Sequence, residues 1–374
     1  MSLLHWSRPL LAAGLVLAGC KSNAPAPAGK DAGAPAAAAT SKAPAAAVAS
    51  GPALSYLKPV DGDGCQWIRQ PLPSGEPTVF PFDAACNQSV LSWSPNSMEG
   101  LVFSLALGEG EQPRLWRVDF TTKAGKPVSL AGLPGGEGAQ TVDKPFISKV
   151  GFDTEGRVVA LVSDVYTKRP FEKGPDGQSI ISFEGERYPV KQGEGAPGLA
   201  MAYRLEGAAW KRSEVKASAY GAEDAPGIDA LSVKLRSVKA LVVFDELPGQ
   251  EAAGGAVAKL DEALPGQDAS GKWMSLPTPG GALHYRGTRD PEEDSLYPSA
   301  PVRWEQEGKL VELEGLTAKP GDRLGFQVQG DLLLVFVLGE ETRSAHVLDS
   351  RTKKSLVAAS AIESATFWPE PLKP

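Results

Sequence analysis

The sequence WSPNSMEGLVFSLAL (Trp93–Leu107), followed closely by RLWRVD (Arg114–Asp119), contains the clearest indication of the fold. It joins an aromatic residue, a polar turn with proline and asparagine, and a strand rich in Val, Leu and Phe. The second segment has the same strand character. A unit of this kind buries its apolar face only against neighbouring units, so the stretch predicts a domain of repeated β-meanders.

Shorter versions of the same pattern occur elsewhere in the chain. In each of them an aromatic residue is followed four positions later by a glycine that can adopt the positive φ of a tight turn. The pairs are Phe152 and Gly156, Tyr203 and Gly207, Trp304 and Gly308, and Phe326 and Gly330.

Trp93-Ser94-Pro95-Asn96 and Arg114–Asp119 resemble blades of the TolB-type propeller repeat. The resemblance covers about 35 residues clearly. It implies a β-propeller, and at roughly 40–50 residues per blade the domain would hold six to eight blades. Two β-sandwich domains are the alternative, because aromatic-turn-strand patterns occur in any antiparallel protein.

The rest of the chain after Leu54 also predicts an all-β fold. Short apolar or alternating runs are broken by Gly, Pro, Asp or Asn, and only Ala256–Leu264 could form a helix. Gly249–Lys272 interrupts this pattern and is interpreted either as a long insertion between two strands or as the boundary between two units. The expected strands are Val90–Trp93, Leu101–Leu107, Arg114–Phe120, Val158–Val162, Ser179–Phe183, Met201–Leu205, Ala230–Leu235, Ala240–Phe244, Leu310–Leu313, Leu332–Leu338 and Ala345–Leu348.

The N-terminus carries an export signal. Arg8 precedes the apolar run Leu10–Ala18, which is about half the ~20 residues that a membrane-spanning helix needs. Leu17-Ala18-Gly19-Cys20 closes this run and resembles the lipobox of bacterial lipoproteins. The resemblance implies a signal peptide over residues 1–19 and lipidation of Cys20, and Lys21 resembles the pattern of lipoproteins passed on to the outer membrane.

Residues 20–53 are predicted to be the lipidated Cys and a tether, followed by the β domain over residues 54–374. Positions 21–53 contain 15 Ala and 5 Pro. An apolar content that is almost all Ala has little to bury, and repeated Pro prevents a continuous helix. Two or three acyl chains on one Cys give stable membrane anchoring.

Composition and cysteine content narrow the function classes. Without Arg8 the chain has 37 basic against 45 acidic residues, a net charge of −8, which gives no electrostatic footprint for nucleic acid. Cys65 and Cys86 are the two cysteines after Cys20. In an oxidising compartment such an isolated pair predicts a disulfide. Two buried free thiols are the alternative, or a metal-binding pair, against which the lack of a nearby His argues.

No pattern of catalytic, cofactor-binding or metal-ligating residues stands out. His284 and His346 lack the close companions of a zinc site. Gly266–Lys272 has Trp273 where a P-loop needs Ser or Thr, and Asp61–Gly64 lacks the later ligands of a calcium loop. Asp290–Asp294 is interpreted as a solvated acidic loop. We therefore name no catalytic residue, no cofactor and no metal ligand.

The sequence as a whole predicts a lipid-anchored protein of the bacterial cell envelope that binds or scaffolds envelope components without catalysis. Its expected partners are the membrane, through the lipid, and an envelope protein. An exported hydrolase, or a protein that binds cell-wall glycan or other polysaccharide through a propeller channel, is the alternative. The seven tryptophans after Cys20 are spread along the chain, which favours blade cores over a clustered stacking platform.

Overall fold

The computed structural model describes residues 51–372, except for 62–63, 106–110, 138–143, 191–194, 221–226, 237–246, 253–258, 262–270 and 291–294. The predicted signal peptide, Cys20 and most of the predicted tether lie outside these residues. Antiparallel strands make up most of the described chain, as predicted. No helix among the described residues is long and apolar enough to cross a membrane.

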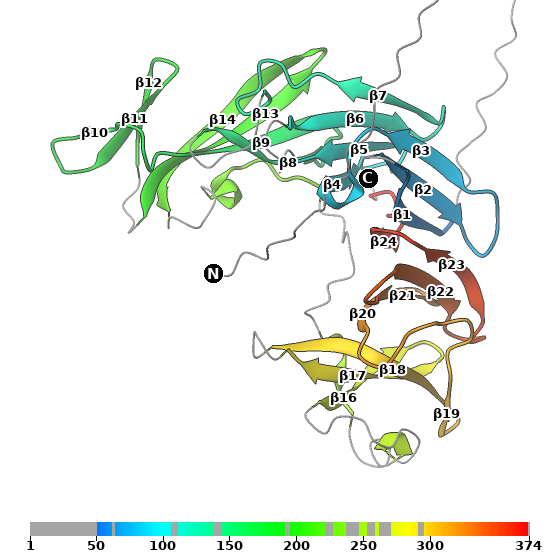
Figure 1. The fold of residues 1–374 in the computed structure, drawn as a ribbon. Coiled ribbons are helices and arrows are strands. Elements are labelled where there is room, and N and C mark those ends of the chain that lie inside the picture. Colours follow the sequence, from blue (N-terminus) through cyan, green and yellow to red (C-terminus); the bar gives the residue numbers. More distant parts are fainter. Residues whose placement is uncertain are drawn as a thin grey trace, which may run out of the picture. The chain divides into compact units, whose positions relative to one another are not determined.

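The first sheet combines the two ends of the described chain (Figure 1). Its strands are β1 (Ala53–Pro59), β2 (Cys65–Pro71), β3 (Thr78–Phe82) and β24 (Ser364–Phe367), in the order β24-β1-β2-β3. The last strand, β24, runs antiparallel to β1, from Leu54 opposite Phe367 to Leu57 opposite Ser364. Within the described residues, the last strand therefore completes the sheet that the first strand begins.

The second sheet contains the sequence that predicted the repeat. Strands β4 (Ser89–Trp93), β5 (Glu99–Ser104), β6 (Arg114–Asp119) and β7 (Ala124–Val128) pair in chain order. The turn between β4 and β5 is closed by the Ser94 hydroxyl, which accepts the Glu99 N–H at 2.9 Å and contacts Asn96 Oδ1 at 2.7 Å. Polar side chains thus fix this turn.

The third sheet has the same four-stranded plan with one insertion. It is built from β8 (Phe146–Phe152), β9 (Val158–Val165), β13 (Ala196–Glu206) and β14 (Ala209–Tyr220). Between β9 and β13 the chain forms a separate three-stranded sheet (Figure 1). Its strands are β10 (Glu172–Lys173), β11 (Ser179–Phe183) and β12 (Glu186–Pro189).

The remaining strands form a nine-stranded sheet that divides into two meanders. The first contains β15 (Gln250–Glu251), β16 (Lys272–Thr278), β17 (Gly281–Arg289), β18 (Leu296–Gln306) and β19 (Lys309–Val311). The second contains β20 (Arg323–Gln329), β21 (Leu332–Leu338), β22 (Arg343–Asp349) and β23 (Ser355–Ser360). A single residue pair, Ser299 with Arg323, joins β18 to β20.

This connectivity is propeller-like. Four-stranded meanders follow one another along the chain, and the C-terminal strand closes the first of them, whereas β-sandwiches use Greek-key connections. The described residues form five four-stranded meanders, counting β16–β19 and β20–β23. The predicted count of six to eight blades stays a prediction, because several segments lie outside the described residues.

The tryptophans are less evenly distributed in space than along the chain. Trp67, Trp93 and Trp368 belong to one buried cluster with Phe80 and Phe120, and Trp116 packs at its edge. The Trp67 ring lies 5.2 Å from Trp93 and 5.1 Å from Phe120, both edge-on. This cluster, which we call the aromatic core, joins the first sheet to the second.

The predicted strand Ala230–Leu235 is wrong. The chain there forms a short 3₁₀ helix at Ile228–Ala230 and then an irregular segment with one isolated bridge, Asp153 to Leu235. Its alternating apolar residues Leu231, Val233 and Leu235 pack flat on β9 and β13. The alternation of apolar and polar residues in this segment therefore reflects burial of one side of the segment, without pairing to a neighbouring strand.

The other predicted strands overlap strands of the structure where they are described, but β5 ends at Ser104 and β19 at Val311, before the predicted ends Leu107 and Leu313. The predicted turn glycines Gly156, Gly207, Gly308 and Gly330 adopt positive φ. Residues 259–261 of the predicted helix Ala256–Leu264 are helical. The predicted strand Ala240–Phe244 lies outside the described residues.

Replacing Gly100 with alanine is expected to destabilise the aromatic core. A Cβ at this position would lie 2.5 Å from Cζ3 of Trp67 and 2.6 Å from Cζ of Phe120, and neither ring can bend away. Overpacking of this kind costs about 1–3 kcal/mol of the free energy of unfolding, measurable by urea denaturation. Gly125→Ala is the control, because its Cβ would meet Val118 at an ordinary 3.7 Å. Equal stability of both variants would contradict the prediction.

Candidate functional site

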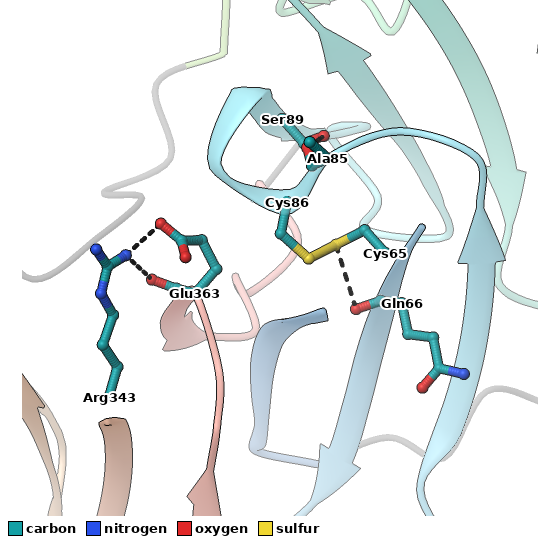
Figure 2. Close-up of a disulfide and its surroundings, with 7 residues drawn as sticks. All are labelled: Cys65, Gln66, Ala85, Cys86, Ser89, Arg343 and Glu363. Carbon is teal, nitrogen blue, oxygen red and sulfur yellow. Dashed lines mark hydrogen bonds and ion pairs between the residues drawn. A yellow bond between two sulfur atoms is a disulfide. The ribbon is translucent and has the colours of Figure 1, made fainter. Parts of the chain in front are cut away.

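The predicted disulfide between Cys65 and Cys86 is present (Figure 2). Cys65 is the first residue of β2, and Cys86 begins the 3₁₀ helix Cys86–Gln88 that leads from β3 into β4. Their Cα atoms are 5.2 Å apart, and both residues are buried in the aromatic core. The bridge therefore attaches the first sheet to the connection that enters the second.

Two further contacts in Figure 2 hold the same region. The Ser89 hydroxyl donates to the Ala85 carbonyl at 2.8 Å and closes the turn around Cys86. Arg343, on β22, forms an ion pair with Glu363, which directly precedes β24. Strand β24 is thus fixed at its start as well as by pairing with β1.

A cavity of about 590 Å³ lies where the chain enters and leaves the β domain, and we call it the junction cavity. Its wall comes from Gly51 and Pro52 before β1, the β4–β5 turn, the β20–β21 turn and the residues after β24. The lining combines apolar with hydrogen-bonding side chains. The main contributors are Pro52, Arg69, Met98, Gln329, Trp368 and Pro371.

Arg69 and Trp368 form the inner wall of the junction cavity. The Arg69 guanidinium lies 5.2 Å from the centre of the Trp368 ring, and both residues are buried. Burial lowers the pKa of Arg69 from its ordinary value, because the charged form loses hydration. The guanidinium still carries its charge at neutral pH, since the ordinary arginine pKa lies far above that range.

A second buried arginine, Arg236, fixes the outer wall. Its Nη1 donates to the Ser94 carbonyl and to Ser97 Oγ, and its Nη2 donates to the Glu370 carbonyl at 2.6 Å. Ser97 Oγ also donates to the Pro369 carbonyl at 2.9 Å. Burial lowers the pKa of Arg236 as well. These bonds lock the residues after β24 against the β4–β5 turn, so the cavity is pre-formed.

The two histidines are separate buried strand residues. His284 on β17 contacts Glu305 through Nε2 at 3.1 Å, and His346 on β22 contacts the Ser344 hydroxyl at 3.0 Å. Desolvation lowers the pKa of His346. In a Ser-His-acid triad the acid holds Nδ1 and leaves Nε2 for the serine; at His284 the acid occupies Nε2.

Within the described ranges, no group of three or more His, Cys, Asp and Glu side chains could hold a metal ion. The P-loop-like stretch is described only at Gly271 and Lys272, and residues 62–63 of Asp61–Gly64 are outside the described chain. Of the acidic run, only Asp290 is described. It pairs with Arg323, so it joins neighbouring meanders.

The sequence did not indicate Arg69 or Arg236 as site residues. Arg69 lies in CQWIRQP, where a charged residue suggests an exposed position, and Arg236 follows the mispredicted strand. Both are buried because residues close to the C-terminus cover them. The only available signal was Trp93-Ser94-Pro95-Asn96, whose turn contributes Asn96 to the junction cavity.

No protein-family profile matches the chain, and no curated protein sequence matches it. Among solved structures it is similar to a 6-phosphogluconolactonase-like protein of Bacteroides fragilis, at 9% identity and TM-score 0.31, over 86% of this chain and 99% of the other. A second such protein, from Bacteroides uniformis, has 10% identity and TM-score 0.27, over 84% and 99%. A prolyl endopeptidase has 10% identity and TM-score 0.22, over 84% and 43%.

Proposed function

We propose that this protein is a lipid-anchored component of the bacterial cell envelope whose propeller-like domain binds an envelope protein without catalysis. The lipobox-like Leu17-Ala18-Gly19-Cys20 supports the anchor, and Lys21 supports an outer-membrane destination. The domain supplies a rigid binding platform, since its first and last strands share one sheet and a disulfide ties that sheet to the next.

The junction cavity is the observation that carries this proposal. It is pre-formed by Arg236 and large enough for side chains of a partner, since ligand cavities have volumes of roughly 300–1,000 Å³. Pro52, Trp368 and Pro371 contribute apolar atoms to its wall, and Gln329 offers an amide. Aromatic-lined grooves with a few polar groups suit extended peptide segments. We therefore assign the cavity to a peptide segment of a protein partner.

In-cell photo-crosslinking tests the binding site. A photo-reactive residue at Met98, which lines the junction cavity, is expected to capture one protein in proportion to the bait. The control carries the same residue at Lys126, an exposed position on β7. Capture of the same protein from both positions, or of glycan alone from Met98, would contradict the proposal.

Replacing Cys20 with alanine tests the anchor. Without the thiol no acyl chain can be attached, and the acidic domain has no basic surface run to hold it at anionic lipid. The variant is therefore expected to move from the membrane fraction to the soluble fraction, as followed by sedimentation and immunoblotting. Complete retention in the membrane pellet after a high-salt wash would show that the lipid is not the anchor.

A further inference from the structure

A second cavity, separate from the proposed peptide site, lies between the second and third sheets. It has a volume of about 760 Å³ and is bounded by β4, β5, β8 and β9 and by residues 228–236, which we call the strap. Its walls are mainly aliphatic. They include Val90, Leu91, Leu105, Val150, Leu161 and Leu235. We call it the strap cavity.

The strap is held in place by its own contacts. The Arg236 N–H donates to the Phe152 carbonyl at 2.7 Å, and Glu214 accepts both the N–H and the hydroxyl of Ser232, at 2.9 and 3.1 Å. Its apolar side chains pack on β9 and β13. The strap therefore keeps the cavity open as a fixed wall.

Apolar surface remains accessible in this cavity. Val90, at its mouth, is 49% exposed, one of few large hydrophobic residues above a third exposed in the described chain. Covering such surface is favourable, because it removes apolar area from water. The cavity thus fits the apolar part of a ligand.

The charged residues at the mouth indicate which polar group the ligand would carry. Lys149 and Lys234 line the cavity, are exposed, and form no ion pair within the described residues. Among the described lining residues, Asp229 is the one acidic residue. A basic mouth on a chain with net charge −7 favours an anionic head group.

We propose that the strap cavity binds a long-chain carboxylate, with the hydrocarbon chain against Val90, Val150 and Leu235 and the carboxylate between Lys149 and Lys234. The aliphatic walls and the two lysines of the lining match the two parts of such a molecule. This proposal does not depend on peptide binding at the junction cavity, so one of the two proposals can be wrong while the other is right.

Fluorescence titration with cis-parinaric acid tests the assignment. The protein is the full chain with Cys20→Ala, which carries no acyl chain of its own. Saturable binding is expected, and Lys149→Glu with Lys234→Glu should weaken it about tenfold, because two attractive charges become repulsive. The methyl ester of the probe should bind this double variant as it binds the parent chain. Lys126→Glu with Lys319→Glu gives the same change in net charge at exposed positions elsewhere and should leave both affinities unchanged.

Val90→Trp tests the apolar part, since the larger side chain would fill the mouth and should abolish binding of both probes. Val328→Trp is its control, because Val328 is similarly exposed, at 41%, but lies on β20 outside the cavity. Absence of saturable binding would overturn the assignment. Equal weakening of acid and ester by the lysine reversals, or unaltered binding by Val90→Trp, would do the same.

Discussion

Replacing Trp67 with alanine is expected to lower the free energy of unfolding by about 3–5 kcal/mol, the range for large aromatic truncations in a core. Trp67 is fully buried at the centre of the aromatic core. Its ring contacts Trp93 and Phe120 edge-on and stacks on Trp368 at 5.8 Å. Its indole N–H donates to the Ser55 hydroxyl at 2.8 Å. The variant would leave a cavity between the first and second sheets and an unpaired hydroxyl.

Denaturant unfolding followed by circular dichroism measures this loss. Trp67→Phe should lose much less, because it keeps an aromatic ring and gives up mainly the hydrogen bond. Trp116→Ala is the matched control, since Trp116 is partly exposed at the edge of the same cluster. If Trp116→Ala proved as destabilising as Trp67→Ala, the central role of Trp67 would be disproved.

Removal of the disulfide is expected to cost about 3 kcal/mol, because the bridge closes a loop of about 20 residues and restricts the unfolded chain. Cys65 and Cys86 are separated by 21 positions, and both side chains are buried. The double variant Cys65→Ala with Cys86→Ala still places a small apolar side chain at each of the two buried positions. It should unfold at a lower denaturant concentration than the oxidised parent.

Thiol labelling supplies the control for this comparison. Denatured but unreduced protein should show no labelling at Cys65 or Cys86, and labelling should appear after reduction. Reduced parent and double variant should then share one unfolding midpoint. An oxidised parent that unfolds at that same midpoint would show that the bridge adds nothing to stability.

Local patterns predicted part of the fold. Ser179–Phe183 and Leu332–Leu338 match β11 and β21 residue for residue. Leu332–Leu338 is wholly apolar, Ser179–Phe183 contains two Ile and a Phe, and each run is followed by a glycine-containing turn. Strand β14 was missed, since it alternates Lys, Arg and Glu with small residues and lies at the outer edge of its sheet. Charges at a sheet edge remove the apolar signal from which strands are predicted.

The candidate sites were less predictable than the strands. The cysteine pair was predicted, because only one pairing is available after Cys20. The junction cavity depends on contacts between Arg69 and Trp368 and between Arg236 and Glu370, which are far apart in the chain. The strap cavity depends on a segment whose alternation imitates a strand. Neither arrangement follows from local periodicity.

The pairing of β24 with β1 limits when the first sheet can form during synthesis of the chain. Its partner β1 leaves the ribosome earlier, and the pairing of Leu57 with Ser364 has to wait until residue 364 has been made. Between them lie about 300 residues, or roughly 15–60 s of translation at ~5–20 residues per second. During that interval β1 has an open edge toward the place of β24, and an open edge can pair with other chains. The first sheet can therefore reach its four-stranded form only after β24 has been synthesised.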